Sequence, residues 1–261
     1  MPSSPNVSVE IRDLHKSFRC EEVLKGINCK IDPGGIFVIM GPSGSGKSVL
    51  LKHIIGLLQP DRGEILIQGQ SIDSPDIRDI FRMAMVFQSA ALLTSLTVAE
   101  NVGLFLSEHR LAPPDQIARV VAEKLAAVGL EGLEDRMPNE LSGGMQKRVA
   151  IARALVGDPQ LILFDEPTGE LDPLMAVAVG EEILKLKTLT QATSIVVTHD
   201  RHLAFGIADR MAMITAGEIL FVGAPAAFRD NADPRIHDFI YAELPASHTA
   251  SQRTDPNPSN L

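Results

Sequence analysis

Gly41-Pro42-Ser43-Gly44-Ser45-Gly46-Lys47-Ser48 is a glycine-rich stretch with the spacing of a loop that wraps the phosphates of a nucleotide. The apolar run before it, residues 35–40, predicts a buried parallel strand, and residues 49–55 after it predict a helix. Such a loop requires this strand-loop-helix context. The sequence therefore predicts a nucleoside triphosphate site at the start of that helix.

Each residue type in the stretch suits phosphate binding. Glycines let successive backbone N–H groups turn inward, and the helix N-terminus adds the positive end of its dipole. Lys47 brings a point charge to the β- and γ-phosphate oxygens, and Ser48 offers a hydroxyl to Mg²⁺. The candidate nucleotide-binding residues here are Gly41, Pro42, Ser43, Gly44, Ser45, Gly46, Lys47, Ser48 and Val49.

Composition and charge limit the class of protein. The chain has 261 residues, 45% hydrophobic and 22% charged, which is typical of a globular protein with one large core or two smaller ones. A net charge of −9 argues against a nucleic-acid partner, because binding the phosphate backbone through a basic face needs clustered Lys and Arg. Cys20 and Cys29 lack the spacing of metal ligands, so reduced thiols are expected rather than a disulfide.

Two kinds of hydrophobic segment are missing from the sequence. The N-terminus has no basic stretch followed by an apolar one, and no run of about 18 apolar residues could span a bilayer. We therefore expect a cytosolic chain that cannot itself be a channel.

Strand and helix patterns alternate along the chain. Short strands are predicted at 7–11, 23–31, 65–69, 83–87, 161–164 and 194–197, and a helix at about 176–189. From Val98 to about Val156 the period is helical, with an apolar face at Ile117, Val120, Val121, Leu125 and Val128 and a stop at Gly129. This order predicts an α/β fold with a mostly parallel core sheet and an inserted helical subdomain.

Two adjacent carboxylates, Asp165 and Glu166, follow the apolar strand 161–164. Ligands bind at this carboxyl end of strands in α/β folds. Because successive side chains of a strand point in opposite directions, the two acids should have different roles. We expect Asp165 to hold Mg²⁺, directly or through water, and Glu166 to polarise the water that attacks the γ-phosphate.

A second glycine-rich helix start, Leu141-Ser142-Gly143-Gly144-Met145-Gln146, precedes a helix predicted at 147–156 and offers another phosphate site. A nucleotide already wrapped by its own loop has little room for a second such motif of the same subunit. The simplest arrangement is a two-fold dimer in which Ser142, Gly143, Gly144 and Met145 cover the nucleotide of the second copy.

In chain order the sequence has Phe18, Gly41 to Ser48, Gln88, Leu141 to Met145, Asp165-Glu166, Leu171-Asp172 and Thr198-His199-Asp200. This ordered series resembles the motifs of the ATP-binding cassette (ABC) ATPases, and the resemblance runs from about Val7 to Phe228. The resemblance implies the P-loop ABC fold with an N-terminal antiparallel β subdomain, and ATP with Mg²⁺ as ligands. It implies that Phe18 stacks on adenine, that Gln88 senses Mg²⁺ and the attacking water, and that His199 contacts the γ-phosphate. The implied catalytic residues are Glu166, His199, Lys47 and Gln88, and the implied metal-site residues are Ser48, Gln88 and Asp165.

The sequence departs from the family pattern in two places. Met145 stands where the family usually has Gln, and Gly169-Glu170 stands where Ser-Ala is common. Neither change removes a catalytic group. Glu170 adds a carboxylate near the expected dimer seam, which leaves the detail of the contact between the two sites open.

The loop from Phe87 to Val98 is more apolar than a free loop should be. It either folds onto the helical subdomain or forms a groove for a helix of a membrane partner. The resemblance implies the second, because ABC transporters receive a permease helix in this region. We expect Lys147 and Arg148 to lie on a solvated face of their helix.

Three segments are similar to the ATPase subunits of the Mla (maintenance of lipid asymmetry) and MCE class of phospholipid transporters: the loop that begins at residue 87, residues 140–148 and residues 233–240. This resemblance implies a peripheral location on the cytoplasmic face of the inner membrane and phospholipid as indirect cargo. The implied partners are a second copy, integral membrane permease subunits, an MCE-domain protein and a small cytosolic regulatory subunit.

Alternatives in other classes remain open. The ATPase of a small-solute importer or of a lipoprotein-release system would share the nucleotide chemistry, as would a non-transport cassette that regulates cell-wall enzymes. A DNA-repair cassette is not expected, because only 94 positions separate Ser48 from Ser142 (142 minus 48), with no long coiled coil between them. A translation factor is not expected either, because translation factors of this type carry two cassettes per chain and this sequence has one.

The expected domain layout is one ABC ATPase domain at 1–244, with the helical subdomain at about 90–157 and a C-terminal segment at about 226–244. Phe228, Ile236, Phe239, Ile240 and Leu244 could either dock on a partner subunit or pack on the chain's own core. Residues 245–261 have almost nothing to bury, so a disordered tail is predicted there.

Overall fold

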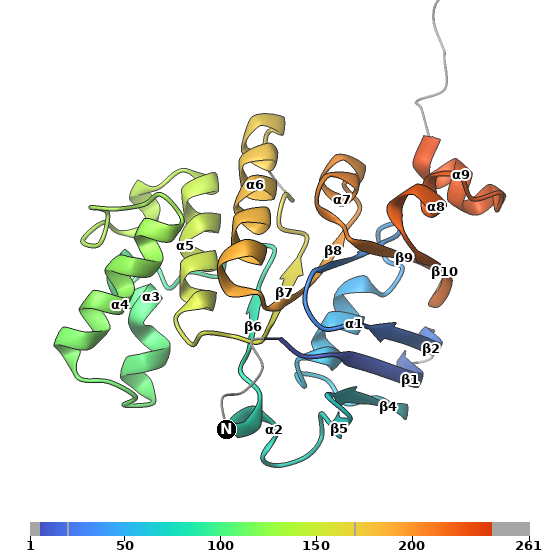
Figure 1. Cartoon of the computed structure of the whole chain (residues 1–261), viewed down its shortest axis with the longest axis horizontal. Coiled ribbons are helices and arrows are strands. Elements are labelled where there is room, and N and C mark those ends of the chain that lie inside the picture. Colours follow the sequence, from blue (N-terminus) through green and yellow to red (C-terminus); the bar gives the residue numbers. More distant parts are fainter. Residues whose placement is uncertain (1–5, 20, 170, 242–261) are drawn as a thin grey trace, which may run out of the picture.

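A central sheet with helices around it and a smaller second sheet form the fold (Figure 1). The computed structural model describes residues 6–19, 21–169 and 171–241. The central sheet has the order β10-β9-β3-β8-β7-β6; β10 is antiparallel to β9, and the other strands are parallel. Its strands are β3 (Ile36–Met40), β6 (Met83–Val86), β7 (Leu161–Asp165), β8 (Thr193–Thr198), β9 (Arg210–Thr215) and β10 (Glu218–Gly223). The predicted mostly parallel core sheet is confirmed.

Both faces of the central sheet are buried, which explains the continuous apolar runs of its strands. Successive side chains of β3 alternate between two cores: Ile36, Val38 and Met40 join the cluster on the helical side, whereas Phe37 and Ile39 join the cluster that faces the smaller sheet. The carboxyl ends of the parallel strands are thereby held between two packed layers.

The smaller sheet is antiparallel, in the order β2-β1-β4-β5. Together with the helix after the glycine-rich loop, its elements are β1 (Val9–Phe18), β2 (Glu21–Ile31), α1 (Lys47–Ile54), β4 (Arg62–Ile67) and β5 (Gln70–Ser71). β1 runs seven residues beyond its predicted end, because register shifts beyond Ile11 break the alternation. β4 ends at Ile67, since Gln68 and Gly69 form a left-handed turn.

Cys29 lies on β2 as a free, buried thiol, as expected. Burial raises its pKa to about 11, which keeps it protonated and poorly reactive. Cys20 lies outside the described residues.

Three helices pack against one another beside the central sheet: α3 (Val98–Glu108), α4 (Pro114–Ala127) and α5 (Gly143–Leu155), with the short turn η1 (Pro138–Glu140) before α5. α3 begins where predicted, because Thr97 and Glu100 form a reciprocal capping box. The predicted apolar face of α4 enters the core. α5 begins four residues before the predicted start, since Ser142 caps it.

The remaining helices are α2 (Ile77–Ile80), α6 (Pro173–Thr190), α7 (Arg201–Ile207), α8 (Pro225–Arg229) and α9 (Pro234–Tyr241). Phe228, Ile236 and Ile240 are buried in the chain's own core cluster. The Phe228 ring packs edge-on against Phe205 and Phe221. Of the two expectations for the end segment, packing on its own core therefore accounts for these three residues. Leu244 and the tail at 245–261 lie outside the described residues.

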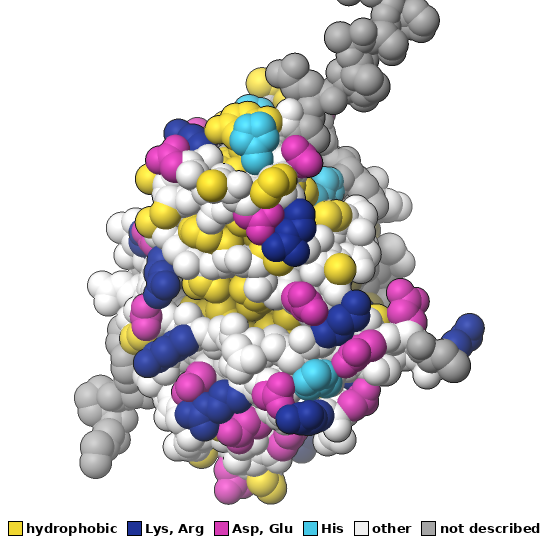
Figure 2. All heavy atoms as spheres, turned by 90° about the vertical axis from the view of Figure 1, so that its right-hand side faces the viewer, with side chains coloured by type: hydrophobic (Ala, Val, Ile, Leu, Met, Phe, Trp, Pro, Cys, Tyr) yellow, Lys and Arg dark blue, Asp and Glu magenta, His cyan; other side chains and the backbone are white. Residues whose placement is uncertain are grey.

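Figure 2 shows the side of the molecule that faces right in Figure 1, where charged side chains of both signs are interspersed over the lower part. In the smaller sheet Arg12 pairs with Glu10 and Glu64, and Lys16 pairs with Asp61. Within the described ranges, every helix is too short or too polar to cross a bilayer.

Candidate active site

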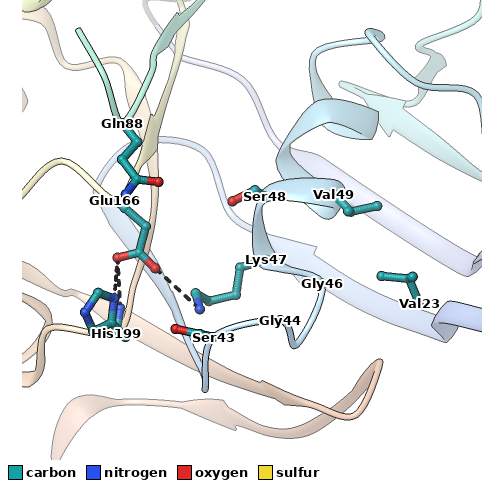
Figure 3. Close-up of a pocket in the computed structure, with 10 residues that line it drawn as sticks. All are labelled: Val23, Ser43, Gly44, Gly46, Lys47, Ser48, Val49, Gln88, Glu166 and His199. Carbon is teal, nitrogen blue, oxygen red and sulfur yellow. Dashed lines mark hydrogen bonds and ion pairs between the residues drawn. The ribbon is translucent and has the colours of Figure 1, made fainter. Parts of the chain in front are cut away.

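A cavity of about 310 Å³ lies where α1 begins, beside the carboxyl ends of several central strands (Figure 3). It is lined by Val23, Ser43, Gly44, Gly46, Lys47, Ser48, Val49, Gln88, Glu166 and His199. All but Val23 are among the residues predicted from the sequence. Segments far apart in the chain therefore meet at one site, in the position where α/β folds bind ligands.

The glycine-rich loop depends on close backbone packing. A Cβ on Gly41 would lie 2.1 Å from the carbonyl oxygen of Ile214, so only glycine fits. Gly46 has a left-handed φ of 99° and is the N-cap of α1, where no side chain accepts a hydrogen bond from the first turn. The α1 N-terminus thus keeps donors for an anion, unlike α5 and α7, which Ser142 and Asp200 cap. These features fit the phosphates of a nucleotide.

Lys47 is buried, with 5% of its surface exposed. Its ammonium donates to the carbonyls of Gly41 at 2.9 Å and Pro42 at 3.0 Å. The same nitrogen lies 3.4 Å from Glu166 Oε1. A buried charge needs such partners, and here they hold the ammonium inside the loop that would wrap the phosphates.

Ser48 and Asp165 form the second contact of the site. Ser48 Oγ donates to Asp165 Oδ1 at 2.6 Å, so the end of β7 is joined to the first turn of α1. A hydroxyl and a carboxylate oxygen that converge on one point are a donor set that suits Mg²⁺, which prefers oxygen ligands. The described residues at this position therefore fit the expected metal.

Glu166 and His199 form the third contact. Glu166 Oε2 accepts from the His199 backbone N–H at 3.2 Å and lies 2.9 Å from His199 Nδ1. Glu166 is 8% exposed. The two acids have different partners, as the sequence predicted. The reason is a turn rather than the strand pleat, because β7 ends at Asp165 and Glu166 takes a left-handed φ of 44°.

Gln88 lies just after β6 and places its carboxamide beside Glu166 in the cavity (Figure 3). A Cβ on Gly169 would lie 3.2 Å from Gln88 Nε2. Glycine at this position, one of the departures from the family pattern, therefore leaves room for the Gln88 side chain. Glu170 lies outside the described residues.

Two groups of candidate residues lie away from this cavity. Ser142 and Gly143 are exposed at the start of α5, and Ser142 Oγ accepts from the Met145 backbone N–H at 3.3 Å. Phe18, at the end of β1, is 43% exposed, with the Lys16 ammonium 5.7 Å from its ring centre. None of these residues lines the cavity.

The structure adds contacts that the sequence reasoning missed. Val23 of β2 borders the cavity, and nothing in its local sequence marks it. Thr168 donates to Asp200 at 3.1 Å. Asp200 could have been singled out from the sequence, because an Asp commonly stands at the start of a helix. The expectation that Lys147 lies on a solvated face is wrong: it is 5% exposed and donates to the backbone carbonyl of Gln88.

Residues 24–169 match the family model of the ABC transporter. The chain is 39% identical to Protein TRIGALACTOSYLDIACYLGLYCEROL 3, chloroplastic, of Arabidopsis thaliana, over 94% of this chain and 76% of that protein. It is 38% identical to the intermembrane phospholipid transport system ATP-binding protein MlaF of Haemophilus influenzae, over 90% of each. A sulfate/thiosulfate import ATP-binding protein, CysA of Synechocystis, is 40% identical over 90% of this chain, which spans 66% of that relative.

A solved structure supports the same relationship. The ATP-binding cassette MJ0796, in a dimeric post-hydrolysis state bound to ADP and Pi, matches with a TM-score of 0.75 and 33% identity, over 83% of this chain and 98% of that one. The family match covers more than half of this chain, and the relatives align over nine-tenths of it. The chain therefore belongs to the ABC transporter family, as an ATP-hydrolysing, ATP-binding subunit.

Proposed function

We propose that this subunit drives a membrane permease that moves phospholipid between membranes. The observation that carries the proposal is the alignment with MlaF, which extends over 90% of both chains at 38% identity. An alignment of that length includes the loop after β6, and not only the nucleotide site that all ABC ATPases need. Phospholipid is the indirect cargo in this account, since the chain's own cavity suits a nucleotide.

Glu166 is the residue to which we assign water activation. Its buried carboxylate would take the proton of the attacking water, and the His199 contact fixes which way Oε2 points. Lys47, held by two loop carbonyls, would bind the β- and γ-phosphate oxygens. Gln88, whose carboxamide lies beside Glu166, would orient the same water.

Ser48 and Asp165 would hold Mg²⁺, which when bound neutralises charge on the phosphates. Gln88 would complete this set from the end of β6. Residues 41–46 and Val49 would supply the loop and the first helical turn around the phosphates, and Phe18 would stack on the adenine ring.

The complete site would need a second copy of the chain. Ser142, Gly143, Gly144 and Met145 lie away from their own cavity, and the first two are exposed. A two-fold dimer would place them against the nucleotide of the other copy, and the similarity to a dimeric cassette supports this. Each ATP would then hold the two chains together.

The implied partners follow from the same relationship. We expect integral membrane permease subunits that receive the loop after Gln88, together with an MCE-domain protein and a small regulatory subunit. The subunit would sit on the cytoplasmic face of the inner membrane as a peripheral protein.

The test is to purify the native complex from its host in mild detergent, identify the co-purifying chains by mass spectrometry and extract the bound lipid. Permease subunits with an MCE-domain protein and phospholipid are the expected result. A solute-binding protein in their place would favour an importer, the class of the CysA relative, and would overturn the phospholipid proposal.

A further inference from the structure

Two basic side chains of α5 bind the backbone of the loop that carries Gln88. Lys147 donates to the Gln88 carbonyl. Arg153 donates to the carbonyls of Ala90 at 2.9 Å and Ala91 at 2.7 Å. The two side chains are six residues apart on α5, roughly 9 Å along the helix axis, so they hold the loop at two separate points.

Ala90 and Ala91 need such support. Both have a left-handed φ, of 57° and 49°, which L-residues other than glycine avoid because the Cβ crowds the backbone. The planar guanidinium of Arg153 offers two donors in a fixed geometry, and it contacts both carbonyls of this turn. The side chain of Arg153 thus favours one backbone conformation of the loop.

Lys147 acts on the residue that faces the cavity. Its ammonium is nearly fully buried and would be costly there without acceptors. It binds the main chain of Gln88, while the Gln88 side chain lines the cavity beside Glu166. A shift of α5 therefore moves the Gln88 backbone directly.

The same helix begins with the exposed Ser142 and Gly143. If these residues meet the nucleotide of the second copy, as proposed above, α5 connects that nucleotide to the Gln88 of its own chain. The proposed contact of Ser142 and Gly143 with that nucleotide and the contact of Lys147 with Gln88 both lie on one rigid helix of 13 residues. The path between the two ATP sites then needs no rearrangement of the central sheet.

We propose that Lys147 and Arg153 are positioning residues that hold the Gln88 loop to α5 and so set where Gln88 stands for ATP hydrolysis. This inference rests on the proposed function of Gln88 and of the α5 N-terminus. Neither basic side chain lines the cavity, and both act through the loop backbone. Charge alone does not suffice at Arg153, because Lys cannot supply two donors in a plane.

The test compares Lys147→Met and Arg153→Lys with the control Arg148→Met in the full-length protein. Arg148 is the neighbouring basic residue on α5, and it donates to the backbone carbonyl of Val128, at the end of α4, rather than to the Gln88 loop. Hydrogen exchange is followed at the amides of Ala90, Ala91 and Leu93, which donate to Phe87, Ser89 and Asn101 respectively. We expect faster exchange in the first two variants and not in the control.

Kinetics separate positioning from general damage. We expect kcat to fall roughly 10- to 100-fold in Lys147→Met and Arg153→Lys, because small displacements of a positioning group have effects of this size. The KM for ATP should stay within about threefold, since the nucleotide-binding loop is untouched. Lys147→Arg should recover most of the loss, and Lys147→Met should add little to Gln88→Ala, because both changes act at one point.

Unchanged exchange in the loop, or unchanged kcat in both variants, overturns the inference. So does full additivity of Lys147→Met with Gln88→Ala. Equal kcat in the wild type and in Gln88→Ala would overturn the role proposed for Gln88, while the exchange data would still decide whether Lys147 and Arg153 hold the loop.

Discussion

The Glu166 carboxylate is held by His199 at two points, the backbone N–H at 3.2 Å and ring Nδ1 at 2.9 Å from the same oxygen, Oε2. The other oxygen, Oε1, lies 3.4 Å from the Lys47 ammonium. One carboxylate therefore joins the turn after β8 to the glycine-rich loop, and its two oxygens are distinguished by their partners. This asymmetry orients the group to which we assign water activation.

Removing the His199 ring should lower kcat while nucleotide binding persists. His199→Ala keeps the backbone donor to Oε2 and loses the ring contact. We therefore expect kcat to fall by roughly 100-fold, the lower end of the effect of a group that assists proton transfer. Steady-state ATPase assays and binding of a fluorescent ATP analogue measure the two effects. His202→Ala, in the first turn of α7 and outside the cavity, is the matched control. A kcat equal to that of the control would rule out this role for the ring.

Weakening the Ser48–Asp165 pair should raise the Mg²⁺ concentration needed for hydrolysis. Asp165→Asn keeps an oxygen donor and the side-chain size but removes the charge that attracts the ion. Titration of ATPase activity with Mg²⁺ should show a half-maximal concentration raised roughly tenfold or more, the change expected for about 1.4 kcal/mol of lost binding free energy. An unchanged titration curve would mean that Asp165 holds no metal.

Asn101 should stabilise the loop after Gln88. Its side chain is fully buried; it accepts from the Leu93 backbone N–H at 2.8 Å, and its amide donates to the carbonyls of Leu93, Leu96 and Thr97. Asn101→Ala leaves backbone groups unpaired and should lower the free energy of unfolding by roughly 1–3 kcal/mol. Urea denaturation measures this free energy of unfolding. Glu108→Ala, an exposed position on the same helix, is the control. Equal stability of both variants would contradict the assignment.

The buried His53 predicts a loss of stability in acid. Burial lowers its pKa, and Nε2 lacks a hydrogen-bond partner among the described residues. The folded state binds the proton less tightly than the unfolded chain does, so stability falls as the pH drops below the unfolded value of about 6.5 and on through the lowered folded pKa. Lys16 and Asp61 are the charged neighbours.

Urea midpoints at about pH 7.5 and about pH 5.5 check this dependence. The difference between them should be smaller in His53→Gln than in the wild type, because the variant has lost the titrating group while keeping Lys16 and Asp61. An equal difference in both proteins would assign the acid sensitivity to other residues.

Most strands of the central sheet and most residues of the cavity could be predicted from the sequence, because both depend on local sequence patterns. Residues 161–166 predicted a buried strand that delivers two acids, and the structure has β7 followed by Asp165 and Glu166 in different contacts. Seven of the nine predicted cavity residues belong to the glycine-rich stretch, the helix start after it and the acid pair, whose spacing reflects the chemistry. Gln88 and His199 were predicted only from the resemblance to the ABC ATPases.

The missed features depend on distant packing. Lys147 was expected in solvent, and its burial follows from the loop around Gln88, 59 residues away in sequence. β1 continued through bulges that hide its period, and α7, β9 and β10 were not assigned. Val23 reaches the cavity only because β2 lies beside the glycine-rich loop, where a Cβ on Gly46 would lie 3.4 Å from Val23 Cγ1.

Two copies of this chain should close on ATP, and Glu166 should be needed to reopen them. Light scattering with and without ATP measures the mass of Glu166→Gln in solution. We expect about twice the 28.2 kDa of one chain with ATP and Mg²⁺, and a return to the single mass when Lys47 is also replaced by Ala. ATP turnover should be reduced by roughly 10²- to 10⁴-fold. If Glu166→Gln stays at the single-chain mass in ATP, or hydrolyses ATP at the wild-type rate, the role of Glu166 in an ATP-closed dimer is wrong.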